Sequence, residues 1–131
     1  MSNLKFRVWD IGNKLMLHQL EESPCFGQFE GDNYVSIEDV FFYEKDSFKV
    51  LQFTGLTDKN GTEVYKGDIL KKEFHQDLFV DFEDGMFVAV STNRIQRINT
   101  AHSAPVYKMT QTGYSVAGNI YENPELLKEE L

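Results

Sequence analysis

Residues 78–90, with the sequence LFVDFEDGMFVAV, decide the class of fold. Two runs rich in valine and phenylalanine, residues 78–82 and 86–90, flank the short polar segment Glu83-Asp84-Gly85. β-branched and aromatic residues favour strands, and an Asp-Gly pair supplies the positive φ angles that a tight hairpin turn needs. The stretch therefore predicts an antiparallel β-hairpin.

Further β-prone runs lie on both sides of this hairpin. An opening hairpin is predicted over residues 5–17, because the turn formers at 10–13 separate two apolar runs. Gly67 permits a tight bend before a strand that begins at Ile69-Leu70. The remaining predicted strands are residues 40–43, 48–53 and 114–121.

Two segments lack such periodicity. Residues 18–33 mix acids with Pro24, Gly27 and Gly31, which is typical of a long loop, and residues 23–27 within them predict a turn. Residues 94–103 are polar with Ile95 and Ile98 three apart, a spacing that fits either a loop or one helical turn.

The organisation expected from these elements is one domain of 131 residues. It is mostly β, built from antiparallel hairpins, with an N-terminal β part over about residues 1–60 and a small Src-homology-3-like barrel over about 61–123. A short terminal helix over 124–131 is predicted, because Asn123 is a good cap, Pro124 suits the first turn and Glu125 suits the helix dipole.

Composition restricts the function classes. The single cysteine, Cys25, cannot form an internal disulfide, the N-terminus does not resemble a signal peptide, and no stretch approaches the roughly 20 apolar residues needed to cross a bilayer. We therefore expect a protein of the cytosol that does not bind membranes. Cys25 is expected to be an inert thiol, because no base is adjacent to it.

The net charge of −8 disfavours nucleic acid as a partner. Nucleic-acid binding would require the basic residues to converge beside exposed aromatics; these residues are Lys5, Arg7, Lys66, Lys71 and Lys72. An acidic surface suits solubility, a basic protein partner or mimicry of a phosphate backbone. Solubility is the simplest of the three explanations.

No motif predicts a catalytic, cofactor-binding or metal-binding residue. The histidines His18, His75 and His102 are far apart and lack metal-ligand spacing. An enzyme would have to combine carboxylates of one glycine-rich segment with a histidine; the candidates are Asp58, Glu63, Asp68 and His75. Asp58 beside Asn60-Gly61 and Asp68 after Gly67 are, however, typical acceptors for backbone N–H groups at turns.

Two further sets of residues are singled out. Aromatic side chains that can form an interaction surface, or support self-association, are Trp9, Phe53, Tyr65 and Tyr121. Trp9 lies on the strand face opposite Phe6 and Val8, so either it packs beneath a second layer or it is exposed. Residues predicted to determine turns and the fold are Gly55, Asp58, Asn60, Gly61, Gly67, Asp68, Gly118 and Asn119.

Four segments in order, KFRVWD (5–10), QFTGLTDKNG (52–61), VYKGDI (64–69) and GNIYENPELL (118–127), resemble the hallmark segments of the YopX family. Lys66 and Phe53 depart from that pattern, where an acid and a tyrosine are expected. The resemblance implies a mostly β protein with a barrel-like part, encoded by bacteriophages and prophages of Gram-positive bacteria. The family has no established catalytic residues, so none is carried over to this chain.

The function expected from these observations is that of a phage or prophage accessory protein in the host cytosol. We expect a non-catalytic module that binds a host or phage protein or forms a homo-oligomer. The alternatives are a nucleic-acid-binding small barrel and an enzyme with a carboxylate and histidine site. No cofactor is expected.

Overall fold

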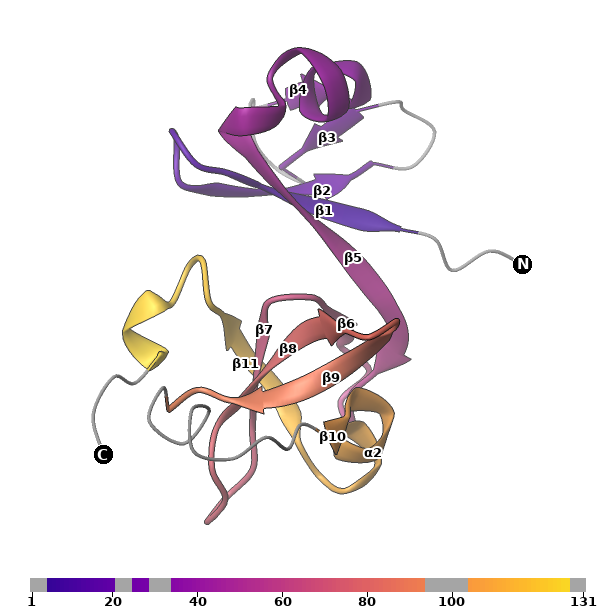
Figure 1. Cartoon of the computed structure of the whole chain (residues 1–131), viewed down its shortest axis with the longest axis vertical. Coiled ribbons are helices and arrows are strands. Elements are labelled where there is room, and N and C mark those ends of the chain that lie inside the picture. The colour runs from indigo at the N-terminus through magenta and orange to yellow at the C-terminus, as the bar shows by residue number, and fades with distance from the viewer. Residues whose placement is uncertain (1–4, 21–24, 29–33, 94–103, 128–131) are drawn as a thin grey trace. The chain divides into compact units, whose positions relative to one another are not determined.

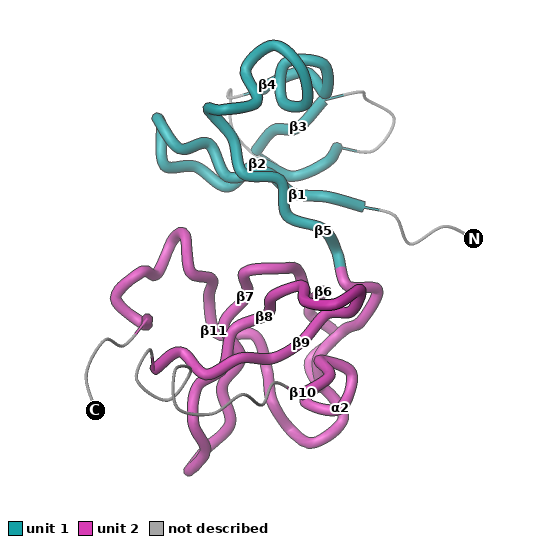
Figure 2. Tube along the Cα trace, in the orientation of Figure 1, with its two compact units in different colours: residues 1–53 teal, residues 54–131 magenta. Residues whose placement is uncertain are grey.

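The computed structural model describes residues 5–20, 25–28, 34–93 and 104–127. The described residues form mostly β-structure in two antiparallel sheets, as predicted (Figure 1). The chain divides into two compact units, Met1–Phe53 and Thr54–Leu131, which we call unit 1 and unit 2 (Figure 2). Each unit is described by itself.

The first sheet has the strand order β4-β3-β2-β1-β5-β6. The predicted opening hairpin is confirmed: β1 (Phe6–Asp10) pairs with β2 (Leu15–Gln19), with Val8 opposite Leu17. Strand β5 (Phe48–Thr57) lies on the other side of β1 and places Val50 opposite Val8. A core cluster of unit 1 consists of the buried side chains of Val8, Leu17, Phe26 and Val40.

The long loop predicted over residues 18–33 is wrong in part. His18 and Gln19 end strand β2, and β3 (Cys25–Gly27) pairs with both β2 and β4 (Tyr34–Ser36). The turn predicted at 23–27 is therefore a strand from Cys25 onward. Phe26 explains the difference, because its side chain is buried and its burial stabilises the strand although the flanking residues are typical of loops.

The strand predicted at residues 40–43 is also wrong, because Asp39–Tyr43 forms a single π-helical turn. The Glu44 N–H donates to the Asp39 carbonyl at 2.7 Å, and the Asp39 N–H donates to Ser36 Oγ at 3.1 Å. A strand would direct Val40 and Phe42 to one face. The turn instead buries Val40 in the core and leaves residues 41–43 exposed.

Unit 2 contains a five-stranded antiparallel sheet in the order β10-β9-β8-β7-β11. Its strands are β7 (Asp68–Lys71), β8 (Leu78–Glu83), β9 (Met86–Ser91), β10 (Ala104–Pro105) and β11 (Ser115–Asn119). Strand β6 (Glu63–Tyr65) precedes β7 and helix α2 (Val106–Gln111) follows β10 (Figure 1). The buried core consists of Val64, Leu70, Val80, Ala89, Val106 and Tyr114.

The hairpin that decided the fold class is confirmed. Glu83 pairs with Met86 at its end, and Asp84 and Gly85 adopt φ angles of 50° and 83° between them. Positive φ at both central residues is the conformation of the turn that joins two right-twisted strands most tightly.

The C-terminal helix is shorter than predicted. Pro124–Leu126 forms a 3₁₀ helix, and the backbone is extended again at Leu127. Residues 128–131 lie outside the described residues, as do residues 94–103. The predicted cap is wrong: the Asn123 side chain does not cap this helix but accepts a hydrogen bond from the Asn119 N–H at 3.1 Å. Closure of the predicted barrel over residues 61–123 stays a prediction.

Candidate functional site

The aromatic residues predicted to form an interaction surface lie mostly in the protein interior. Phe53 and Tyr65 are only 9% and 6% exposed, and Trp9 and Tyr121 are half-buried. Tyr121 packs over Gly67, where an added Cβ would approach the Tyr121 ring to 3.0 Å. Phe53 and Tyr65 therefore contribute to packing, and exposed aromatics must be sought elsewhere.

Asp58 is buried and forms the hub of a turn. Its Oδ1 accepts the N–H groups of Asn60 at 2.8 Å and Thr62 at 2.9 Å, and its Oδ2 accepts the Val116 N–H of strand β11 at 2.8 Å. Burial by itself would raise the pKa of Asp58, but these three hydrogen bonds and the charge of Lys59 outweigh it and lower the pKa below its usual value. Through these hydrogen bonds the Asp58 carboxylate fixes the backbone of the turn at Asn60 and Thr62 and joins it to strand β11.

Asp68 and Asn119 act in the same manner. Asp68 is buried and its Oδ2 accepts the Tyr65 N–H at 2.7 Å. The Asn119 Oδ1 accepts the N–H groups of Tyr121 and Glu122 at 3.0 and 2.8 Å. The predicted turn glycines Gly55, Gly61, Gly67 and Gly118 all have positive φ.

The carboxylates and the histidine considered for an enzyme site, Asp58, Glu63, Asp68 and His75, each make contacts with different neighbours. The Tyr65 hydroxyl lies 3.4 Å from Glu63 Oε1, and the exposed His75 ring places Nδ1 2.9 Å from the Glu73 carbonyl oxygen. Within the described ranges, no group of three or more His, Cys, Asp or Glu side chains could hold a metal ion.

The basic residues required for nucleic-acid binding are also engaged locally. Arg7 is buried in unit 1, where Lys5 Nζ lies 5.6 Å from the centre of the Phe53 ring. In unit 2, Lys71 Nζ lies 3.6 Å from Asp77 Oδ2, and Lys72 Nζ lies 5.9 Å from the centre of the Tyr114 ring. Lys66 is half-buried.

The most exposed apolar side chain of the described chain is Phe74, in the loop between β7 and β8. We call residues 72–77 the Phe74 loop. The Phe74 side chain is 95% exposed, and its backbone has a φ of 65°. The left-handed region costs an L-residue other than glycine about 1–2 kcal/mol, so both the side chain and the backbone of Phe74 are unfavourable for folding alone.

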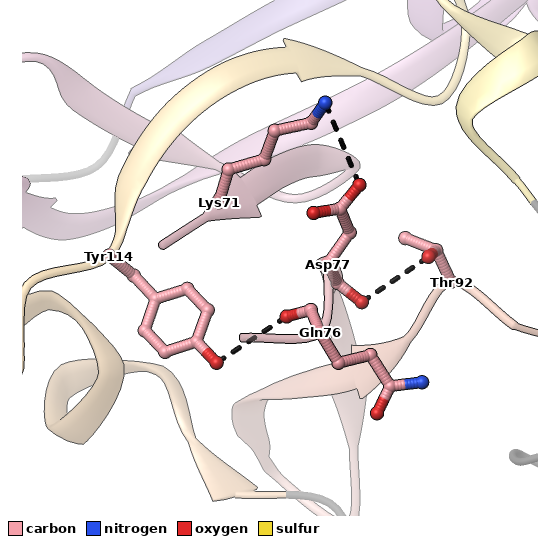
Figure 3. A network of polar contacts seen from close by, with 5 residues as sticks. All are labelled: Lys71, Gln76, Asp77, Thr92 and Tyr114. Atoms are coloured by element: carbon pink, nitrogen blue, oxygen red, sulfur yellow. Dashed lines mark hydrogen bonds and ion pairs between the residues drawn. The ribbon is translucent and has the colours of Figure 1, made fainter. Parts of the chain in front are cut away.

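Hydrogen bonds from Tyr114, just before β11, and Thr92, just after β9, hold the end of this loop at Gln76 and Asp77 (Figure 3). The Tyr114 hydroxyl donates to the Gln76 carbonyl at 3.4 Å. Thr92 donates both its N–H, at 3.1 Å, and its Oγ1, at 3.3 Å, to the Asp77 carbonyl. The Lys71 and Asp77 side chains pair across the base of the loop.

Aromatic packing adds to this support. The His75 ring meets the Tyr114 ring edge to face, with 6.2 Å between the ring centres, and the His75 N–H closes a turn on the Lys72 carbonyl at 3.0 Å. Burial, together with the negative charge of Asp77, raises the pKa of Tyr114, so its hydroxyl stays protonated as a hydrogen-bond donor. The Phe74 loop is therefore an ordered loop from which one aromatic side chain projects into solvent.

Unit 1 contains a second feature, an open hollow of about 550 Å³, which we call the unit 1 hollow. It lies between the β1–β2 turn, strand β4 and the segment that leads into β5. The side chains that line it include the apolar Tyr34, Val35 and Phe48 and the acidic Asp10, Glu44 and Asp46. Beside the hollow, the π-helical turn exposes Phe42 and Tyr43 by 72% and 75%.

Sequence reasoning missed both features. Phe74 is the lone apolar residue in the polar segment KKEFHQD (71–77), and an isolated aromatic in a predicted turn is a signal that could have identified it. The hollow had no such signal, because its walls come from segments far apart in the sequence. In the part of the chain that the structure describes, no helix has the length and apolar character needed to cross a membrane.

Comparisons with known proteins place the chain in a family. Protein EF1440 from Enterococcus faecalis is similar in structure, with a TM-score of 0.59 and 28% sequence identity over 95% of this chain and 98% of that chain. YopX from Bacillus subtilis has the same TM-score at 20% identity, over 99% of this chain and all of that chain, and this likeness shows the fold alone. No curated protein sequence matches. The model of the YopX protein family matches residues 5–128, and the chain therefore belongs to the YopX family.

Proposed function

We propose that this protein is a non-catalytic protein-binding module, with Phe74 as its anchor. We place it in the cytosol of a bacterial host, as an accessory protein of a phage or prophage. The observation that carries the proposal is the combination of a 95% exposed phenyl ring, a left-handed backbone and a loop held by Lys71 of β7, Thr92 and Tyr114.

Binding would bury a phenyl ring that the free protein leaves in water. Burying a phenylalanine side chain stabilises a structure by about 1.5–3 kcal/mol, and none of this is realised while Phe74 lies in water. The contacts of His75, Gln76 and Asp77 fix the backbone beside Phe74, which reduces the entropy that binding must overcome. Aromatic anchors of this kind supply much of the affinity of protein interfaces.

Neighbouring side chains support a protein partner over a nucleic acid. The ammonium of Lys71 is paired with Asp77, and Glu73 lies next to Phe74 in the loop. The chain as a whole carries a net charge of −8. This net charge of the whole chain opposes the approach of a phosphate backbone, whereas it does not oppose an apolar pocket on a protein.

A photo-crosslinking amino acid at position 74 tests the proposal in the bacterial cytosol. The matched control places the same group at Tyr107, which is also an exposed aromatic of unit 2. We expect position 74, but not position 107, to crosslink to one recurrent protein. With that protein purified, Phe74→Asn should weaken binding at least tenfold, while Tyr107→Ala should leave it unchanged.

The outcomes separate a binding role from a structural one. Circular dichroism and thermal unfolding should give the same folded state for Phe74→Asn as for the parent protein, because the ring contributes little to packing. Equal crosslinking at positions 74 and 107, or unchanged affinity of Phe74→Asn for the captured protein, would overturn the proposal.

A further inference from the structure

We infer that the unit 1 hollow is a binding site for a guanidinium group, carried on an arginine side chain of a second protein. The inference goes beyond the proposed function, because the hollow belongs to unit 1 and Phe74 belongs to unit 2. Three properties of the hollow point to this ligand: walls that are fixed in place, exposed aromatic faces and an acidic lining.

Backbone hydrogen bonds fix the walls of the hollow. The Ile11 N–H of the β1–β2 turn donates to the Ser47 carbonyl at 3.1 Å, and so joins the turn to the segment that leads into β5. The turn is closed by the Lys14 N–H, which donates to the Asp10 carbonyl at 2.8 Å. The opposite segment is closed by the Ser47 N–H, which donates to the Glu44 carbonyl at 2.9 Å. The hollow therefore exists before a ligand arrives, which reduces the entropy lost on binding.

The aromatic faces in the hollow suit a flat cation. Tyr34 is 60% exposed and Phe48 is half-buried, so both rings offer surface to a ligand. A guanidinium is planar and stacks on aromatic faces, whereas an ammonium is a compact and strongly hydrated charge. The volume of about 550 Å³ falls within the range of roughly 300–1,000 Å³ that is usual for ligand pockets, which leaves room for the alkyl chain that carries the group.

The charged lining of the hollow is acidic. Of the described residues that line it, Asp10, Glu44 and Asp46 carry carboxylates and none is basic. Asn13 positions the Asp10 carboxylate by donating its N–H to Oδ1 at 3.1 Å and its Nδ2 to Oδ2 at 2.9 Å. Within the described ranges, neither Glu44 nor Asp46 forms an ion pair with a basic side chain, and both are exposed. The fork of N–H groups on a guanidinium matches such carboxylates.

Lysines near the hollow in sequence do not neutralise its lining. Lys14 follows the β1–β2 turn and Lys45 separates the two acids of the opposite segment, but neither lysine lines the hollow. Both lysines are exposed, so water and salt screen their charges. A guanidinium in the hollow can contact the carboxylates directly, whereas it meets the lysines across solvent.

Exposed aromatics beside the hollow favour a protein as the source of the guanidinium. Phe42 and Tyr43 of the π-helical turn are 72% and 75% exposed, and Glu44 follows them directly. A free cation leaves these rings in water, whereas apolar residues that flank an arginine can cover them. One arginine and its neighbours bury less than the roughly 1,200–2,000 Å² of a stable complex, so a short peptide should bind weakly.

Titration of the ¹⁵N-labelled protein with short peptides tests the inference. The probe is the tripeptide Leu-Arg-Leu, acetylated and amidated at its ends, and the matched control replaces arginine with citrulline, which has nearly the same shape and no charge. The arginine peptide should shift the amide signals of Ile11, Tyr34 and Phe48 in a saturable manner. The citrulline peptide should bind at least about threefold more weakly, because it lacks the charge that the carboxylates attract.

Free ethylguanidinium distinguishes a small cation from a protein side chain. It carries the same charged group without flanking residues, so it should bind more weakly than the arginine peptide. Raised ionic strength should weaken the arginine peptide more than the citrulline peptide.

Substitutions locate the site. Glu44→Gln together with Asp46→Asn should weaken the arginine peptide about threefold or more, because both changes remove charge and keep size. The matched control, Glu38→Gln together with Asp84→Asn, removes the same number of charges from exposed positions outside the hollow and should leave the affinity unchanged. Phe74→Asn should also leave it unchanged, so failure of this site and failure of the Phe74 anchor are separate results.

Any of five results would overturn the inference. The first three are a lack of saturable shifts, shifts confined to residues outside the hollow, and equal binding of the citrulline peptide. The fourth is unchanged affinity of the Glu44 and Asp46 variant. The fifth is ethylguanidinium that binds as tightly as the arginine peptide, which would make a free cation, and not a protein, the occupant of the hollow.

Discussion

Replacing Asp58 with asparagine should destabilise unit 2 by about 2–4 kcal/mol, because three backbone N–H groups depend on its carboxylate. Asparagine keeps one oxygen, which can remain on the Asn60 and Thr62 N–H groups. Its amide nitrogen then faces the Val116 N–H, so two donors oppose each other and the Val116 hydrogen bond is lost. Hydrogen bonds to a charged acceptor contribute about 1.5–3 kcal/mol each, and the exposed turn around Asn60 can recover part of the loss from water.

Urea unfolding at pH 7, followed by far-ultraviolet circular dichroism, measures this difference. Trp9 fluorescence is a poor substitute, because Trp9 lies in unit 1 and Asp58 in unit 2. The matched control is Asp84→Asn at the exposed hairpin tip, where asparagine tolerates the φ of 50°, and its free energy of unfolding should stay within about 0.5 kcal/mol of the parent value.

The pH dependence gives the same prediction an independent check. The folded-state pKa of Asp58 lies below the value of 3.8 expected in the unfolded chain, so the ionised carboxylate stabilises the fold above pH 3.8. As the pH falls through the folded-state pKa, this contribution disappears. The gap between the parent protein and Asp58→Asn should therefore be full at pH 7 and shrink as the pH falls below 3.8. A gap under about 0.5 kcal/mol at pH 7, or one that does not change with pH, would refute the reasoning.

Three further substitutions, at Phe74, Gly118 and Tyr114, test other local features of the structure. Phe74→Asn should leave the free energy of unfolding unchanged or raise it by up to about 1 kcal/mol in urea titrations, because asparagine tolerates positive φ and the ring packs on little; a clear loss would contradict this. Gly118→Ala should cost about 2–4 kcal/mol by the same assay, since φ is 154° and the added Cβ would collide with the Asn123 side chain, whereas a neutral effect would show that Asn123 moves aside. Tyr114→Phe should cost about 1 kcal/mol and speed amide hydrogen exchange in the Phe74 loop, because the hydrogen bond to the Gln76 carbonyl is lost; unchanged exchange would mean that this bond does not hold the loop.

The parts of the fold that could be predicted are those set by short-range chemistry. Asp84-Gly85 and the turn formers at 10–13 each specify a reversal within a few residues, and both hairpins formed as expected. The π-helical turn at Asp39–Tyr43 could not be predicted, because Val40, Phe41, Phe42 and Tyr43 all favour strands. Two effects override that preference: Val40 is buried in the core, and the Ser36 hydroxyl accepts a hydrogen bond from the Asp39 N–H.

The candidate site was harder to predict, because it depends on contacts between distant residues. Asp58 is a recognisable turn acceptor, yet its bond to Val116 spans 58 positions of sequence and has no local signal. Tyr114 and Gln76 are likewise 38 positions apart. The sequence around Phe74 shows only that an aromatic residue lies in a polar segment. The contacts of the loop with Tyr114 and Thr92, which the sequence does not reveal, show that the loop is ordered.

The border between the two units falls inside strand β5. Phe53 ends unit 1 and Thr54 begins unit 2, while the strand itself runs from Phe48 to Thr57 without interruption. Most junctions between compact parts are exposed linkers that a protease can cleave and recombination can exchange. Here the junction is hydrogen-bonded backbone, so the two halves should be inherited together, and a gene fragment that ends at residue 53 would leave a cut strand in place of a free-standing domain.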